Sequence, residues 1–356
     1  MSRVVGIDPG TKSFDFFGLA DDCDEIILDV SMPTSRIGAD PESVIDLLKD
    51  VCPDLIVGPS GYGVPVKNIR DITPTDIFLM SLVLRDDKKS ILGMRRLIEI
   101  LGKHSLPVCF IPGVIHLPTV PSFRKINRID MGTPDKLCSC ALAIRDQATR
   151  RRIDYDQTSL ILLEIGFAHT AAIAVDAGAV VDGIGGSSGG IGFLSMGAMD
   201  SELAYLLRGF PKEFMTGRGA RTLAGSENVI APEEIAHNSD VWLALMDGAV
   251  RNVLALTAAT VPDEILLSGR LSKIPELQAE LTRRLATVAP VRPVEGFHGV
   301  KIAKESAQGA ALIASGLAHG RYENLVATMR IGDACGTVLD YVPSKYVNLT
   351  DFIDTG

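Results

Sequence analysis

Two short stretches of this sequence carry the residue types that hold phosphate groups and a magnesium ion. The first runs from Val4 to Ser13 and the second from Leu160 to Thr170. In each, a run of β-branched residues or leucine ends in an acid, and a glycine and a hydroxyl residue follow. Glycine lets a backbone approach phosphate oxygens closely, turn amides donate hydrogen bonds, and an acid holds hydrated Mg²⁺. We therefore expect two strands that lead into tight turns, which face each other and clamp a nucleotide.

The acids of the two stretches are Asp8 and Glu164, and we expect both to be catalytic. Asp8 is also the first candidate metal ligand, and the alternative for it is an acid that only caps a turn. Glu164 ends a very apolar strand, where a carboxylate is costly to bury unless it is paired or linked to a metal. The residues expected to bind the nucleotide beside these acids are Gly10, Thr11, Lys12, Ser13, Gly166 and Thr170.

The loop from Asp182 to Gly192 has six glycines in eleven positions. Many backbone amides without side chains around them suit an anion or an acyl phosphate. We expect Gly185, Gly186 and Ser187 to form a substrate loop, and the alternative is a flexible connector.

Composition limits the classes of protein and partner. The chain has 356 residues, of which 46% are apolar, so two medium domains with cores of their own are expected. The formal charge of −9 argues against nucleic acid as a partner, because phosphate backbones are held by clustered Lys and Arg. The longest apolar stretch, Ile161 to Val181, contains Glu164, His169 and Asp176, which favours buried strands over a membrane span.

The cysteines and the first residues of the chain bear on where the protein is located. The six cysteines form no CxxC pair, which favours reduced thiols, and Asp8 and Lys12 interrupt the start before any secretory signal could form. We expect a cytoplasmic protein without a membrane partner, and a homodimer is compatible with the sequence.

The pattern of elements occurs twice along the chain. In the first half we expect strands at 3–7, 15–20, 25–30, 55–57 and 108–111, and helices at 43–49 and 91–101. In the second half we expect strands at 160–163, 171–175, 179–181, 264–267 and 291–294, and a helix over about 240–260. Two more helices are expected at 133–144 and 303–319, and strand-like pieces from about 322. The expected domains are 1–132, 133–320 and a C-terminal extension, 321–356.

The paired stretches resemble the phosphate-1 and phosphate-2 motifs of the superfamily of acetate and sugar kinases, Hsp70 and actin. Asp8, Gly10, Thr11 and Ser13 fit the form D-x-G-T-x-S, and Glu164, Gly166 and Thr170 keep the spacing of the acetate kinase element, with Glu in place of His. Within the superfamily the chain is similar to an uncharacterised family of predicted butyrate kinases. The resemblance implies an α/β fold of duplicated RNase H-like (actin-like ATPase) domains, with ATP and Mg²⁺ in the cleft between them. It also implies that the helices at 133–144 and 303–319 cross between the halves.

Further site residues follow from the resemblance. Ser268, Gly269 and Arg270 resemble the adenosine motif, in which the glycine passes beside the purine and Arg270 stacks on it, and the alternative is an ordinary strand-to-helix turn. Glu305 stands where butyrate kinases carry an acid ahead of the last helix, so it is a second candidate metal ligand. The alternative is a surface glutamate at a helix start.

A second substitution, besides Glu164, separates the chain from acetate kinases. There an arginine stabilises the transferring phosphoryl group, and the matching position here is Met199. Arg208, Arg218 and Arg221 are the nearest cations that could replace it, and Arg208 is our catalytic candidate.

These observations predict an ATP-dependent phosphotransferase that acts on a small carboxylate, as butyrate and acetate kinases do, or on another small metabolite. The alternative is a non-catalytic or switch-like ATP-binding module of the same fold, favoured by the departures at Glu164 and Met199. A nuclease would need three or four clustered carboxylates and a basic groove, which are not evident. An iron–sulfur activator ATPase is disfavoured because Cys138-Ser139-Cys140 is a poor cluster framework, and His104 and His116 form no HxxxH metal pair.

Overall fold

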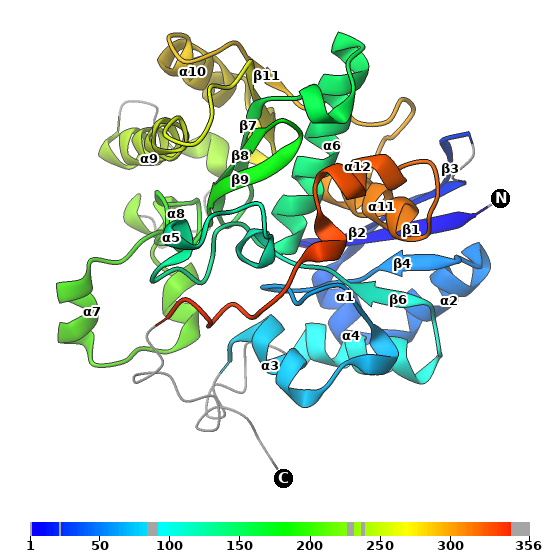
Figure 1. Cartoon of the computed structure of the whole chain (residues 1–356). Coiled ribbons are helices and arrows are strands. Elements are labelled where there is room, and N and C mark those ends of the chain that lie inside the picture. Colours follow the sequence, from blue (N-terminus) through cyan, green and yellow to red (C-terminus); the bar gives the residue numbers. More distant parts are fainter. Residues whose placement is uncertain (1, 21–22, 84–91, 226–230, 236–238, 343–356) are drawn as a thin grey trace.

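The computed structural model describes residues 2–20, 23–83, 92–225, 231–235 and 239–342, with the side chains of 92–95 excepted. They form two β-sheets that lie side by side with helices around and between them (Figure 1). Ile91, the Asp21–Asp22 turn and residues 343–356 of the expected C-terminal extension lie outside the described residues. No described helix is both long and apolar enough to cross a membrane.

The first sheet has the strand order β3-β2-β1-β4-β6-β5. β1, β2 and β3 are antiparallel neighbours, and β4 and β6 run parallel to β1. The strands are β1 (Arg3–Pro9), β2 (Ser13–Ala20), β3 (Glu25–Pro33), β4 (Leu55–Val57), β5 (Lys67–Asn68) and β6 (Val108–Phe110). Except for the two-residue β5, each strand was expected from the sequence.

The second sheet has the order β11-β10-β7-β8-β9. Written from the other edge, β9-β8-β7-β10-β11, it matches β3-β2-β1-β4-β6 of the first sheet strand by strand, and only β5 has no counterpart. Its strands are β7 (Leu160–Ile165), β8 (Thr170–Asp176), β9 (Ala179–Ile184), β10 (Glu264–Ser268) and β11 (Val291–Pro293). All six residues of β7 are buried, as expected for a central strand that is covered on both faces. The expected duplication is confirmed at the level of sheet topology.

The first hairpin of each sheet has the same register. Pro9 pairs with Phe14 at the end of β1–β2, and Ile165 pairs with Thr170 at the end of β7–β8. One step inward, Asp8 pairs with Asp15, and Glu164 pairs with Ala171. The two acids therefore occupy equivalent places, immediately before turns of equal length.

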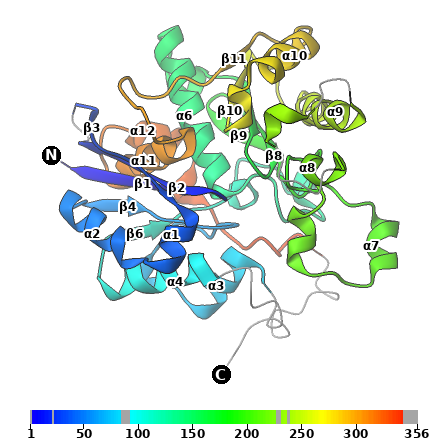
Figure 2. The same ribbon diagram turned by 180° about the vertical axis from the view of Figure 1, so that it is seen from behind.

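Helices cover the sheets on both faces (Figures 1 and 2). The described helices are α1 (Thr34–Ala39), α2 (Glu42–Val51), α3 (Pro74–Ser81), α4 (Leu92–Lys103), α5 (Ser122–Lys125), α6 (Pro134–Arg151), α7 (Ser201–Leu207), α8 (Ala220–Leu223), α9 (Asp240–Leu256), α10 (Pro275–Leu285), α11 (Glu305–Leu317) and α12 (Glu323–Thr328). Among them, α1, α2 and α4 lie on one face of the first sheet and α11 on the other, whereas α9 and α6 lie on opposite faces of the second sheet.

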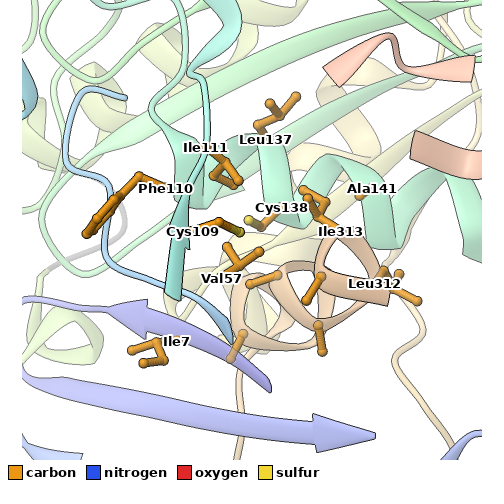
Figure 3. Close-up of a cluster of buried hydrophobic side chains, with 14 of the residues drawn as sticks. Ile7, Val57, Cys109, Phe110, Ile111, Leu137, Cys138, Ala141, Leu312 and Ile313 are labelled. Atoms are coloured by element: carbon orange, nitrogen blue, oxygen red, sulfur yellow. The ribbon is translucent and has the colours of Figure 1, made fainter. Parts of the chain in front are cut away.

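Helices α6 and α11 join the two sheets, as expected. α6 packs on β7 and β8, α11 packs on β1 and β4, and the two helices pack on each other. Small residues allow the close approach, since a Cβ at Gly6 would lie 2.3 Å from the Ala307 carbonyl oxygen and one at Gly309 would lie 1.8 Å from that of Cys138. Figure 3 shows side chains of the first sheet and both helices meeting in one core around Cys109 and Cys138.

The described part of the segment after residue 321, which ends at Val342, differs from the expectation. It forms α12 and a 3₁₀ turn at Ile331–Asp333 in place of strand-like pieces. Tyr322, Leu325, Val326 and Met329 are buried, and their spacing of i, i+3, i+4 and i+7 is that of one face of a helix. The strand interpretation was wrong because a short apolar run does not distinguish the two element types.

Candidate functional site

A cavity of about 530 Å³ lies between the two sheets and is lined by residues of both. Residues of both hairpin turns line it, and so do residues of the first turn of α6 and of the start of α11. Most of the expected site residues line this cavity: Asp8, Gly10, Thr11, Lys12, Ser13, Glu164, Gly166, Gly186, Ser187, Gly269, Arg270 and Glu305.

Four expected site residues do not line the cavity. The Ser268 hydroxyl donates a hydrogen bond to Glu164 Oε2 over 3.3 Å, so Ser268 helps to orient the Glu164 carboxylate. The Thr170 hydroxyl is buried in β8 without a hydrogen-bond partner in the described structure. Gly185 lies against Asp130. Arg208 follows α7 in a left-handed conformation and is exposed.

The sequence analysis missed the cation that neutralises Glu164. Lys136, in the first turn of α6, places its Nζ 2.8 Å from Glu164 Oε1 and 2.5 Å from Asp135 Oδ2. Burial opposes the charge of Lys136, but the two carboxylates outweigh it and hold the pKa of its ammonium well above the usual range. A lysine ammonium has three N–H donors, so one remains after both acids are bonded.

A second lysine, Lys304, lies close to Asp8. Lys304, the residue before α11, has its Nζ 3.8 Å from Asp8 Oδ2 and 3.1 Å from both Asp15 Oδ2 and Ser13 Oγ. Burial raises the pKa of Asp8 to about 7, with Lys304 opposing and Asp135 adding to the rise. Asp8 is thus a buried carboxylate whose charge Lys304 and Lys136 offset only in part, which favours a proton or a metal ion on it.

The two acid–lysine pairs are arranged crosswise. Lys136 comes from the helix that follows the first sheet but pairs with Glu164 of the second sheet. Lys304 comes from the end of the second sheet but lies beside Asp8 of the first. Both crossing helices also begin at the cavity, where their backbone amides add partial positive charge.

The donor set of the cavity suits Mg²⁺ shared with a ligand. No three Asp, Glu, His or Cys side chains converge as a cage in the described part of the chain. Mg²⁺ commonly uses one or two carboxylates, waters and substrate phosphates, and Asp8 fits such a site. Glu305, the other expected ligand, has its carboxylate 3.0 Å from Lys273 Nζ.

The glycine-rich loop is more internally bonded than expected. The amides of Gly185, Ser188 and Gly190 donate to the Ser188 hydroxyl, the Gly185 carbonyl and the Asn252 side chain. The Ser187 amide and hydroxyl both donate to Asp130 Oδ2, over 3.1 and 3.2 Å. Asp130 therefore fixes the loop at the cavity, and these amides are not open for an anion.

A lysine links the two sides of the cavity away from the hairpin turns. Lys212 Nζ donates to the carbonyls of Ser81 and Leu82, at the end of α3, over 2.5 and 3.2 Å. The same ammonium lies 5.1 Å from the centre of the Tyr62 ring. Lys212 follows the second hairpin in the chain, and α3 lies in the part of the chain that forms the first sheet, so this contact joins the two sides of the cavity.

Residues 6–344 match the family model described as "Protein of unknown function (DUF1464)". The chain belongs to this family. No curated protein matches the DUF1464 chain.

Solved structures show the fold of this DUF1464 protein. A propionate kinase from Francisella tularensis superposes with a TM-score of 0.61 and 13% identity, covering 87% of this chain and 98% of that chain. Acetate kinase from Entamoeba histolytica gives 0.58 and 11%, covering 83% and 96%, and acetate kinase from Porphyromonas gingivalis gives 0.58 and 13%, covering 87% and 98%. The fold is therefore the two-sheet α/β architecture of these kinases, as expected from the paired motifs.

Proposed function

We propose that this protein is an ATP-dependent phosphotransferase that transfers a phosphoryl group to a small carboxylate, such as acetate, propionate or butyrate. The observation that carries the proposal is that two equivalent acid-ended hairpins, one from each sheet, line the same cavity. The fold shared with proteins described as acetate and propionate kinases adds support.

In this proposal the chain acts mainly by positioning and by charge. Gly10, Thr11 and Gly166 bind the phosphate chain through the turns, and Gly269 and Arg270 border the adenosine. Asp8 would hold Mg²⁺ there, and the ion would supply positive charge beside the phosphate oxygens. Holding donor and acceptor in line removes much of the entropic part of the barrier.

The acceptor belongs on the Asp130 side of the cavity. Gly186 and Ser187 line it there, beside the apolar walls made by Tyr62, Met80 and Ile111. An apolar wall suits a short aliphatic chain. The acceptor carboxylate and the phosphoryl group are both negative, so a cation must lie between them, and Lys136 has one N–H donor left for this task.

Calorimetry and an acceptor screen test the proposal. We expect Mg·ATP and Mg·ADP to bind with micromolar to millimolar affinity, about −4 to −8 kcal/mol. Trapping acyl phosphate with hydroxylamine should then reveal turnover with acetate, propionate, butyrate or a branched acid. ATP binding without any acyl phosphate would exclude the carboxylate acceptor and favour another metabolite or a switch-like module. Absence of nucleotide binding would overturn the phosphotransferase itself.

A further inference from the structure

Three polar side chains that line the cavity have hydrogen-bonding groups that the described structure leaves unused. They are Tyr62, which lies in the loop after β4, Asp130, which precedes α6, and His169, which lies in the second hairpin turn. The proposed function uses the ring of Tyr62 as an apolar wall, but it gives no task to its hydroxyl, to the Asp130 carboxylate or to the His169 imidazole. These three groups are therefore available to an acceptor.

The Asp130 carboxylate keeps one acceptor site free. Its Oδ1 accepts from the Gly132 amide over 3.0 Å, and its Oδ2 accepts from the Ser187 amide and hydroxyl over 3.1 and 3.2 Å. A carboxylate has about four acceptor sites, two on each oxygen, so one site remains on Oδ1. Asp130 is only 7% exposed, and it forms no ion pair with any described residue. By contrast, Glu164 has the ammonium of Lys136 beside it.

The hydroxyl of Tyr62 forms no hydrogen bond in the described part of the chain. Tyr62 lies near Asp130, because a Cβ on Gly113 would be 2.9 Å from the Tyr62 carbonyl oxygen and 3.0 Å from that of Gly132, whose amide bonds Asp130. Burial raises the pKa of the Tyr62 hydroxyl, and the charge of Asp130 adds to the rise. The hydroxyl is therefore protonated and can donate.

The imidazole of His169 also has no hydrogen-bond partner among the described residues. It packs on the glycine-rich loop, where a Cβ on Gly186 would lie 2.6 Å from the His169 Cβ and 2.8 Å from its Cδ2. Gly186 precedes the serine that bonds Asp130. Burial and the charge of Lys136 lower the pKa of His169, with Asp130 and Asp135 opposing them. The ring is therefore neutral at pH 7 and has one N–H donor.

A hydroxyl group on the acceptor matches these three groups. It has one donor and two lone pairs, so it can donate to Asp130 and accept from Tyr62 and His169. An ammonium group has no lone pair for the two donors. A methyl group would displace water from Asp130 without replacing its hydrogen bond, and a buried charged group left unsatisfied is costly.

We propose that the acceptor is a short aliphatic hydroxy acid, whose hydroxyl donates to Asp130 Oδ1 and accepts from Tyr62 and His169. The inference rests on the proposed function and narrows its acceptor from a small carboxylate to one that carries a hydroxyl. Met80 and Ile111, which also line the cavity, contact the carbon chain. A carboxylate oxygen of the acceptor attacks the terminal phosphorus of ATP, and ADP leaves as its bond to that phosphorus breaks.

The test compares acids that differ only by the hydroxyl. Butyrate is measured against 3-hydroxybutyrate and 4-hydroxybutyrate, and propionate against 2-hydroxypropionate and 3-hydroxypropionate, by kcat/KM for ADP release at saturating Mg·ATP. We expect at least one hydroxy acid to exceed its parent by about tenfold to a hundredfold, as one hydrogen bond to a buried charge provides. Trapping with hydroxylamine should show that the product is an acyl phosphate.

Tyr62→Phe removes one hydroxyl and no hydrogen bond of the described structure. It should reduce the preference for the hydroxy acid by about threefold to tenfold, while ATP affinity and kcat/KM for the parent acid stay as in the wild type. Asp130→Asn should reduce the preference further, but it also disturbs the Ser187 contacts, so the phenylalanine variant is the cleaner probe. Tyr205→Phe is the matched control, because Tyr205 is 71% exposed and outside the cavity.

Each contrary result has a distinct meaning. Equal kcat/KM for the hydroxy acids and their parents, or a preference unchanged by Tyr62→Phe and Asp130→Asn, would overturn the hydroxyl subsite and leave the phosphotransferase proposal intact. A preference for 3-aminobutyrate over both butyrate and 3-hydroxybutyrate would overturn the hydroxyl in favour of an ammonium group. ATP binding without turnover of any acid would overturn this inference together with the carboxylate acceptor.

Discussion

Lys136 Nζ lies 2.8 Å from Glu164 Oε1, so the cation that begins one crossing helix neutralises the acid that ends the first strand of the opposite sheet. Only 13% of the lysine side chain and 8% of the glutamate side chain is exposed. The pair is therefore shielded from water, and its members depend on each other more than surface charges do. This explains how a glutamate is tolerated at the end of a very apolar strand.

Lys136→Met should destabilise the protein by about 3–5 kcal/mol, because it leaves Glu164 buried without a cation. The double variant K136M/E164Q should recover part of that loss, since the charge of Glu164 is removed while Asp135 still lacks its cation. Chemical denaturation measures both. Lys273→Met is the control, because Lys273 is mostly exposed although it also pairs with a glutamate. A double variant as unstable as the single one would contradict the pairing.

The stability of the ligand-free protein should fall as pH rises from about 4 to about 7. Burial raises the pKa of Asp8 from 3.8 to about 7, so the folded state binds this proton more tightly than the unfolded chain does. The resulting stability is complete below about pH 4 and is lost by about pH 7, on the order of 2–4 kcal/mol. The charges of Lys304, Asp135, Lys136 and Asp15 face the Asp8 carboxyl and act on its pKa. Asp8→Asn should flatten the dependence, as followed by denaturation at a series of pH values, and a slope unchanged by the substitution would assign it elsewhere.

Asp8→Asn should also separate the two parts of nucleotide binding. A neutral amide is a poorer ligand for Mg²⁺, whereas the turn amides still bind phosphate. We expect the gain in ADP affinity on adding Mg²⁺ to shrink, with the metal-free affinity retained. Titrations with and without Mg²⁺ measure this, and an undiminished gain would remove Asp8 from the metal site.

Gly185→Ala should disturb the glycine-rich loop. The added Cβ would lie 1.8 Å from Asp130 Oδ1, and Asp130 holds the Ser187 amide and hydroxyl. We expect a loss of about 1–3 kcal/mol and a weaker acceptor interaction. Gly38→Ala is the control, because a Cβ there meets nothing within 4 Å and the position is helical, so stability should rise slightly. Equal thermal unfolding of the two variants would contradict the role of the contact.

Lys212→Met should loosen the contact between the two sides of the cavity. The ammonium bridges to the carbonyls that end α3, and methionine cannot donate to them. Small-angle scattering should show a larger radius of gyration for the ligand-free variant and a return to the wild-type value with nucleotide. Lys103→Met, an exposed change on α4, should have no effect. A variant as compact as the wild type would show that other contacts hold the cavity closed.

The elements of the fold were largely predictable from the sequence because their signals are local. β-branched runs ending in turn residues gave β1, β2, β7 and β8, and the equal spacing from acid to turn in the two hairpins follows from the motifs alone. Helix α6 begins at Pro134, as a proline early in the first turn indicated.

The charge pairs were not predictable, because they depend on how α6 and α11 dock on sheets that are remote in sequence. Lys136 reads as an ordinary residue of a helix start, and the only signal for it was the need of Glu164 for a counter-ion. Asp130 was missed for the same reason, since its role appears only when the glycine-rich loop folds against it.

The crosswise pairing means that the acid of each sheet depends on a lysine from the half of the chain that forms the other sheet. A cut between α6 and β7 would leave one fragment with Asp8 but without Lys304, and the other with Glu164 but without Lys136. Each fragment would expose an acid whose cation is carried by its complement. The same two contacts would therefore make the two fragments complementary in charge, which favours their reassociation.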